Sequence, residues 1–156
     1  MAESQRIEQV WETPGTAEIL EMAKGHVGAL ESSDSDAVWR PLNMHHVLIT
    51  LVGRRSGVPR KVALPFWRDP SGAPIVVASF AGSERHPDWF VNLRDRDANP
   101  TVHCRFQHSE YVSVPEILAG DERAAVWAGL GADRAWYADY QAATVREIPV
   151  TRLAPA

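Results

Sequence analysis

The hydrophobic pattern predicts short strands interrupted by a few helices. Runs rich in apolar and β-branched residues predict strands at 46–52, 60–67, 75–80, 101–106, 111–118 and 148–153. Helical spacing predicts a first helix over 16–31, capped by Thr16, and further helices over 86–95, 120–130 and 135–143. A doubly wound sheet needs a helix after nearly every strand, which this order lacks. The pattern therefore favours an α+β fold built on an antiparallel barrel of about six strands with peripheral helices.

Size and composition indicate one globular domain. The chain has 156 residues, and we place the domain at 16–156 behind a flexible N-terminal lead-in of residues 1–15. The net charge of −4 argues against nucleic acid as a partner, and the single cysteine excludes an internal disulfide. The sequence shows no leader-like segment and no apolar run long enough for a bilayer. We therefore expect a cytoplasmic protein with at most peripheral membrane contact.

A basic turn at 53–61 carries the strongest signal of a binding site. Four of the sixteen Lys and Arg residues fall within it, although the protein is acidic overall. Arginine suits phosphate and carboxylate oxygens, while Gly53 and Gly57 let the backbone turn sharply and approach a ligand. Ser56 adds a hydroxyl, and the N–H groups of such a turn can bind an anion. From the residues alone, the turn is either an anion site, suited to a phosphodiester, or the exposed tip of a basic hairpin.

Two further segments offer candidate site residues. Residues 79–89 join a strand to a helix, where Trp89 is either a core anchor or part of a binding wall. His86 alone is typical of a hydrogen-bonded structural residue. Near the C-terminus, Tyr137 and Tyr140 are three positions apart and therefore share a helix face. Their rings suit either a substrate wall or a core.

Familiar catalytic motifs are absent from the sequence. The six histidines show no metal-binding spacing, and one cysteine cannot build a zinc site, so we predict no metal centre. Neither a G-x-S-x-G elbow nor a G-x-G-x-x-G fingerprint occurs. An enzyme with this sequence would have to take its chemistry from a bound organic cofactor.

A series of short motifs between residues 45 and 153 resembles the deazaflavin-dependent nitroreductase family. The motifs are Gly53-Arg54-Arg55-Ser56-Gly57 with Pro59-Arg60, Ala78-Ser79, Arg85-His86-Pro87 with Trp89-Phe90 and Asn92-Leu93, Asn99-Pro100, Tyr137-Ala138-Asp139-Tyr140-Gln141, and Arg146-Glu147-Ile148-Pro149-Val150. Each motif alone is weak, but their order and spacing together are specific. The resemblance implies a split β-barrel similar to the flavin-mononucleotide (FMN)-binding reductases. It also implies an oxidoreductase that transfers hydride from the reduced deazaflavin coenzyme F-420 to a hydrophobic, electron-poor acceptor such as a quinone, a nitroaromatic compound or a conjugated enone or lactone.

The resemblance further implies roles for individual residues. The phosphodiester and glutamate tail of the cofactor would lie over the basic turn, and FMN is a weaker alternative to F-420. The implied cofactor-binding residues are Arg54, Arg55, Ser56, Gly57, Pro59, Arg60, Ala78, Ser79, Phe80, His86, Trp89 and Asn92. The implied catalytic residues, which would contact the acceptor, are Ser79, Tyr137 and Tyr140. The expected partners are a small hydrophobic substrate and a second copy of the chain in a homodimer.

Two positions depart from the family pattern. Relatives can carry lysine where Phe80 stands and tyrosine where Pro65 stands. The first departure bears on cofactor affinity, and the second bears on activity toward nitroimidazoles. One alternative stays open, namely a protein on the same barrel that binds deazaflavin or fatty acid without turnover.

Overall fold

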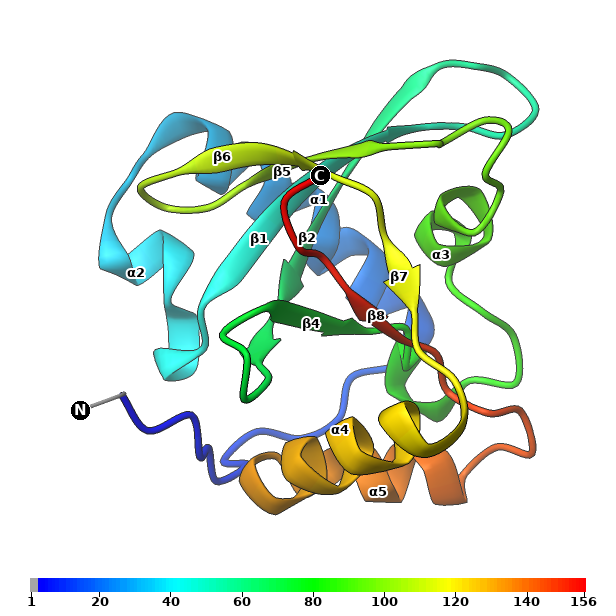
Figure 1. Ribbon diagram of the computed structural model, residues 1–156. Coiled ribbons are helices and arrows are strands. Elements are labelled where there is room, and N and C mark those ends of the chain that lie inside the picture. Colours follow the sequence, from blue (N-terminus) through cyan, green and yellow to red (C-terminus); the bar gives the residue numbers. More distant parts are fainter. Residues whose placement is uncertain (1–2) are drawn as a thin grey trace.

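The chain forms two antiparallel sheets with helices around them (Figure 1). The computed structural model describes residues 3–156. One sheet has the order β2-β1-β5-β6 and contains β1 (His46–Val52), β2 (Pro59–Pro65), β5 (Val102–Arg105) and β6 (Glu110–Ser113). The other has the order β3-β4-β8-β7 and contains β3 (Trp67–Arg68), β4 (Pro74–Val77), β7 (Glu116–Ile117) and β8 (Val150–Arg152). These sheets confirm the predicted α+β class.

Short and long helices surround the sheets. They are α1 (Thr16–Ser32), α2 (Asp36–Trp39), α3 (Asp88–Leu93), α4 (Gly120–Asp133) and α5 (Trp136–Ala142), with 3-10 turns η1 (Pro41–Asn43) and η2 (Phe80–Gly82). Within residues 3–156, no helix combines the length and the apolar content that crossing a bilayer requires.

One apolar core joins the two sheets. Val47, Ile49 and Leu51 of β1 point into it, together with Val76 of β4 and Leu153 at the end of β8. The opposite face of β1 is also covered, because Leu48 packs in a second cluster with residues of α1 and α2. Burial on both faces explains why β1 is a continuous apolar run rather than an alternating one.

The second sheet packs on α4 and α5 through a separate apolar cluster that includes Trp67, Ile75 and Trp136. The N-terminal residues attach to the same region. The Ile7 N–H donates to the carbonyl of Asp133 at 2.9 Å, and the Trp11 ring stands edge-on to Trp136 with centroids 5.0 Å apart. The flexibility of residues 1–15 and the domain boundary at residue 16 stay predictions.

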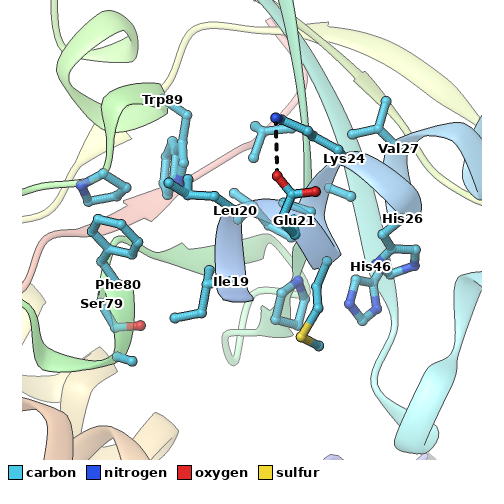
Figure 2. Close-up of a pocket in the computed structure, with 18 of the residues that line it drawn as sticks. Ile19, Leu20, Glu21, Lys24, His26, Val27, His46, Ser79, Phe80 and Trp89 are labelled. Atoms are coloured by element: carbon cyan, nitrogen blue, oxygen red, sulfur yellow. Dashed lines mark hydrogen bonds and ion pairs between the residues drawn. The ribbon is translucent and has the colours of Figure 1, made fainter. Parts of the chain in front are cut away.

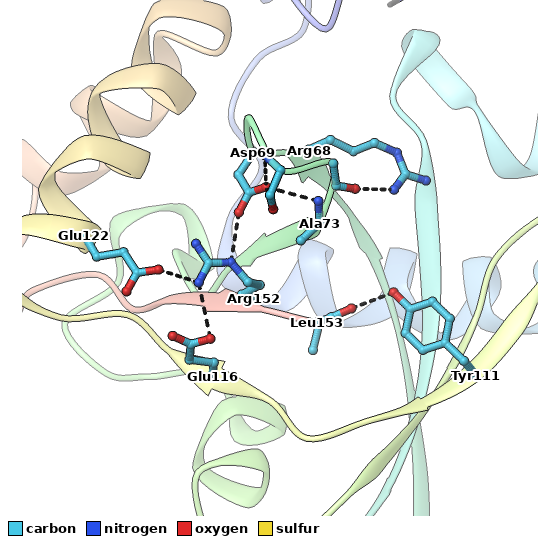
Figure 3. A network of polar contacts seen from close by, with 10 residues as sticks. Arg68, Asp69, Ala73, Tyr111, Glu116, Glu122, Arg152 and Leu153 are labelled. Atoms are coloured by element: carbon cyan, nitrogen blue, oxygen red, sulfur yellow. Dashed lines mark hydrogen bonds and ion pairs between the residues drawn. The ribbon is translucent and has the colours of Figure 1, made fainter. Parts of the chain in front are cut away.

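An ion network ties β8 to its neighbours (Figure 3). Arg152 donates from Nε to Asp69 at 2.9 Å and from Nη1 to Glu116 at 3.2 Å, and it also pairs with Glu122 of α4. These carboxylates come from the β3–β4 turn, β7 and α4. One guanidinium therefore ties β8 to the β3–β4 turn, to β7 and to α4.

Several predicted boundaries are wrong, for local reasons. The strands number eight within residues 3–156, rather than about six, because two predicted runs are broken. The run 60–67 breaks at Phe66, whose N–H donates to the carbonyl of His45, so that β3 can join the other sheet. The run 111–118 breaks around Pro115, which has no N–H for a ladder. At the first helix, Gly15 rather than Thr16 takes the cap position, without a side-chain hydrogen bond.

A fourth boundary error concerns the end of β4. The predicted strand at 75–80 ends at Val77, so Ala78, Ser79 and Phe80 lie outside it. Phe80 and Ala81 adopt φ values of 45° and 52°, a left-handed backbone that a strand cannot contain. The chain therefore leaves the sheet in the tight turn η2, at the edge of the site.

Candidate functional site

A cleft of about 1680 Å³ brings together most of the predicted site residues. Its walls come from α1, the β1–β2 turn, η2, the start of α3, and α5, and Figure 2 shows α1 between its two sides. Ten predicted residues line it: Arg54, Arg55, Ser56, Arg60, Ser79, Phe80, Trp89, Asn92, Tyr137 and Tyr140. Four predicted residues do not line it: Gly57, Pro59, Ala78 and His86.

The β1–β2 turn presents three arginines without acidic partners. Hydrogen bonds from Gly53 N to the Val58 carbonyl and from Gly57 N to the Gly53 carbonyl close the turn, at 2.9 and 2.8 Å. Gly57 has φ +67°, which glycine adopts without a Cβ penalty. The side chains of Arg54, Arg55 and Arg60 are exposed, and none forms an ion pair within residues 3–156.

The fourth cation of this segment is engaged elsewhere. Lys61 Nζ lies 2.8 Å from Glu31 Oε2 of α1, so its charge is compensated inside the protein. The positive charge that remains uncompensated therefore belongs to the three arginines. Such a group favours an anionic ligand.

Two asparagines hold the basic turn in place. Asn92 Oδ1 accepts a hydrogen bond from the Arg54 N–H at 3.0 Å. The buried Asn99 accepts from the Val52 N–H at 2.8 Å and donates to the carbonyls of Val52 and Asn92, both at 2.9 Å. Asn92 thus positions the turn, and its contact with the cofactor stays a prediction. Asn99 belongs to a motif that carries the resemblance, but the sequence predicted no role for it.

Arg146 holds the strained turn η2 from behind. Its guanidinium donates to the carbonyls of Ala78 at 3.1 Å, Ser79 at 2.8 Å and Ser83 at 2.8 Å. The left-handed residues of η2 lie between these carbonyls, and such backbone persists only where its surroundings determine it. Arg146 is therefore a positioning residue for the segment that carries Ser79 and Phe80, a role that its place in the sequence did not predict.

His86 lies beside Arg146 rather than in the cleft. Its Nδ1 is 3.1 Å from Arg146 Nη1, so the imidazole accepts from the guanidinium and carries its proton on Nε2. Burial lowers the pKa of His86, and the charges of Arg146 and Arg94 lower it further. In this structure His86 supports Arg146, and its predicted contact with the cofactor stays a prediction.

Tyr137 and Tyr140 form the wall contributed by α5. Their ring centroids are 6.0 Å apart with planes at 80°, an edge-to-face arrangement. Tyr137 is buried, which raises the pKa of its phenol, whereas Tyr140 is half-buried at the cleft. A Cβ on Gly82 would lie 2.7 Å from the Tyr140 carbonyl, so η2 and α5 pack directly against each other. Ser79 and Tyr140 therefore belong to one packed unit.

Comparisons with known proteins identify the family of this site. The family model for F420H(2)-dependent quinone reductases matches residues 23–155. The chain belongs to this family. An F420H(2)-dependent quinone reductase of Mycobacterium tuberculosis (strain ATCC 25618 / H37Rv) is 30% identical over 141 residues, which cover 82% of this chain and 92% of that protein.

Solved structures agree with this membership. An F420-H2 dependent reductase (FDR-A) shares 34% identity with a TM-score of 0.59, covering 70% of this chain and 93% of its own. A chain described as a domain-swapped dimer shares 30% identity with a TM-score of 0.62, covering 89% of this chain and 98% of its own. The predicted F-420-dependent oxidoreductase and its cofactor are thereby confirmed.

The cleft of this reductase extends to residues that the sequence analysis did not assign to a site. Ile19 and Leu20 of α1 form one wall, so the helix predicted only to lie on the domain also shapes the cleft. Leu20 remains 49% exposed, which apolar spacing alone does not predict. His26, further along α1, and His46, at the start of β1, line the opposite side from Ser79 and Phe80 (Figure 2).

The residues present fit the deazaflavin cofactor of this family. The unpaired arginines and Ser56 suit a phosphodiester, and the aromatic and apolar walls suit a flat ring. Ligand pockets in proteins typically measure roughly 300–1,000 Å³. The cleft exceeds that range, which is compatible with a cofactor and a second ligand side by side.

Proposed function

We propose that this reductase transfers hydride from reduced F-420 to a quinone, with both molecules bound in the cleft between α1 and α5. The observation that carries the proposal is the set of three exposed guanidinium groups that form no ion pair within residues 3–156, at one end of an otherwise largely apolar cleft. An acidic protein that leaves these cations uncompensated has a binding site suited to an anionic tail.

In this proposal, the residues of the basic turn bind the tail of the cofactor. Arg54, Arg55, Ser56 and Arg60 supply charge and hydrogen-bond donors, while Gly57 and Pro59 shape the backbone that presents them. When bound, F-420 supplies a hydride from its reduced ring. The protein contributes binding and orientation, and α1 limits the access of water to the reacting atoms.

The ring and the acceptor occupy the middle of the cleft. Ser79, Phe80 and Trp89 surround the ring, and Phe80 contributes an apolar face where relatives can carry lysine. Ala78 is buried outside the cleft and acts only through the backbone that carries Ser79. The hydroxyls of Ser79 and Tyr140 hydrogen-bond the acceptor oxygen, and a proton comes from solvent. Tyr137 supports Tyr140 through the contact between their rings.

Two further features belong to the same proposal. The core shared by both sheets supports the interpretation that they are the halves of a split β-barrel. The domain-swapped dimer found for a relative supports a homodimer of this chain. A cytoplasmic location with peripheral membrane contact stays a prediction.

Titration of F-420 into the wild type and the Arg60→Ala variant tests the proposal. Loss of one charge-assisted contact costs roughly 1.5–3 kcal/mol, so the affinity should fall about tenfold to a hundredfold. Arg6→Ala is the matched control, because Arg6 is exposed and pairs only with Glu8. An unchanged affinity in Arg60→Ala would contradict the assignment of the turn.

Mixing reduced F-420, the protein and menadione tests turnover. Reoxidation of the cofactor supports the reductase. A spectral shift without reoxidation would instead support the alternative of a binding protein, and failure of F-420 to bind the wild type would overturn the whole proposal.

A further inference from the structure

Two histidines meet at the end of the cleft away from the basic turn. His26 comes from α1, and His46 begins β1, where it pairs with Pro65 at the opposite end of the hairpin from Pro59. Their ring centroids are 4.5 Å apart with planes at 59°. Both line the cleft together with the apolar side chains of Met44 and Val38.

Backbone carbonyls determine which nitrogen of each ring carries the proton. His26 Nε2 lies 2.9 Å from the carbonyl of Val38, and His46 Nδ1 lies 2.9 Å from the carbonyl of Met44. Because a carbonyl only accepts hydrogen bonds, these nitrogens are the donors. In a neutral imidazole the other nitrogen is then an acceptor without a hydrogen.

Burial keeps His46 in this neutral form. It lowers the pKa of His46 to about 4, and the nearby His26 and Arg134 oppose a positive charge there as well. The free nitrogen of His46 therefore cannot donate a proton at neutral pH. This nitrogen can only accept a hydrogen bond.

The two acceptor nitrogens are unpaired within residues 3–156 and are not fully buried, in side chains that line the cleft. Neither has a hydrogen-bond partner within residues 3–156. The unpaired polar side-chain atoms that are fully buried in this range belong to Ser113, Arg123, Arg134 and Thr151, not to either histidine. Each free nitrogen therefore retains some contact with solvent, although His26 is half-buried and His46 is buried. Both side chains line the cleft.

We propose that His26 and His46 form a subsite that binds the hydroxyl group of an aromatic ligand, a phenol or a hydroquinone. Two acceptors select an O–H donor, whereas the oxygen of a ketone or an ether offers them no hydrogen. The apolar neighbours favour an aromatic ring over a hydrated polar molecule. A site built to hydrogen-bond a hydroxyl discriminates against analogues that lack it.

The subsite also distinguishes the product of the proposed reaction from its substrate. This consequence rests on the proposed function. A quinone that takes up one hydride and one proton becomes a hydroquinone, in which both carbonyl acceptors have become hydroxyl donors. The histidine pair therefore binds the reduced form better than the oxidised form.

A matched pair of redox-inert ligands tests the subsite by calorimetry, without F-420 and at mildly alkaline pH. 2-Naphthol carries the hydroxyl, and 2-methoxynaphthalene has the same ring system without the donor. The wild type should bind 2-naphthol more tightly by about threefold to tenfold, the range expected for one neutral hydrogen bond.

Two variants remove the free nitrogens while keeping the structural hydrogen bonds. In His46→Asn the amide N–H can still reach the Met44 carbonyl, and in His26→Gln the amide N–H can still reach the Val38 carbonyl. Each variant should lose most of the preference for 2-naphthol while its affinity for 2-methoxynaphthalene stays unchanged. Thermal unfolding checks that each variant folds, and the half-buried His26 provides the second test if His46→Asn does not.

Equal affinity of the wild type for the two ligands, or a preference that survives both substitutions, would overturn the subsite. Because this assay involves neither cofactor nor turnover, its failure is separate from failure of the reductase proposal. The protein could bind F-420 and reduce menadione yet show no preference for 2-naphthol. That result would overturn only the histidine subsite.

Discussion

Replacing Arg146 with methionine is expected to loosen η2 and to lower both the stability of the protein and its affinity for F-420. The guanidinium donates to three carbonyls at 2.8, 2.8 and 3.1 Å and also to His86 Nδ1 at 3.1 Å. Methionine keeps much of the apolar stem but donates none of these bonds. The substitution therefore leaves η2 without these hydrogen bonds. This turn contains Phe80 and Ala81, both with left-handed backbone.

The size of the effect follows from these contacts. A typical hydrogen bond contributes about 0.5–1.5 kcal/mol net, and bonds to charged groups contribute more. The carbonyls around half-buried Arg146 can regain water, and contacts in one network add incompletely, so each contact is counted at the low end of this range. Taking about 0.5–1 kcal/mol for each of the four contacts gives a loss of about 2–4 kcal/mol in the free energy of unfolding.

Urea unfolding measures the loss of stability, and titration with F-420 measures the loss of affinity. Arg146→Lys keeps the charge, but its single ammonium cannot replace a planar fork that reaches three carbonyls. If Arg146 acts by holding η2, the lysine variant should recover little of either property. Recovery of F-420 affinity by lysine would instead indicate a direct charge contact with the cofactor.

The outcome that would refute this reasoning is a small effect in both assays. Arg146→Met should be compared with Arg6→Ala, whose side chain is exposed and pairs only with Glu8. If the two variants unfold at the same urea concentration and bind F-420 equally well, Arg146 does not hold the turn, and another contact must maintain its left-handed residues.

Three further predictions concern other parts of the cleft. Tyr140→Phe should lower kcat for menadione about fivefold, the worth of one hydrogen bond, without changing the Kd for F-420, and the reverse pattern would remove Tyr140 from the acceptor side. Asn99→Ala should cost about 2–3 kcal/mol by urea unfolding, because it removes three hydrogen bonds at a buried position, and should also weaken F-420 binding. A stable variant with unchanged affinity would contradict this role of Asn99. Burial lowers the pKa of His46 from 6.5 to about 4 on folding, so its contribution to stability is complete above pH 6.5 and falls by about 3 kcal/mol as the pH drops to 4. His46→Asn should flatten that part of the pH dependence of urea unfolding, and parallel curves for the two proteins would show that another group is responsible.

Local sequence patterns predicted the strands best where burial and turn chemistry agree. The bounds of β1 match the prediction of 46–52, because an apolar run buried on both faces ends at Gly53 and the basic turn. The end of β4 could not be predicted from the local sequence. Nothing local to Phe80 and Ala81 favours positive φ, and Arg146, which holds η2, lies more than sixty residues further along the chain.

The candidate site shows the same limit. The cluster of cations at 53–61 is plain in the sequence, but pairing decides which of them are available. Lys61 is compensated by Glu31, which lies 30 residues earlier, whereas the three arginines are not. The histidine pair had no sequence signal, because His26 and His46 belong to no common motif and meet only through the packing of α1 near the start of β1.

The supports of the basic turn explain how its charge stays available to a ligand. The backbone of the turn requires acceptors for the N–H groups of Val52 and Arg54. For Arg54 either an amide or a carboxylate could serve, whereas Asn99 also donates to the carbonyls of Val52 and Asn92, which a carboxylate cannot do. Asparagine at positions 92 and 99 satisfies these N–H groups without adding negative charge. An aspartate at position 92 would accept the same bond from Arg54, but its charge would attract the neighbouring guanidinium groups and compete with an anionic ligand. The choice of neutral amides is therefore consistent with a turn whose arginines are kept for a partner outside the protein.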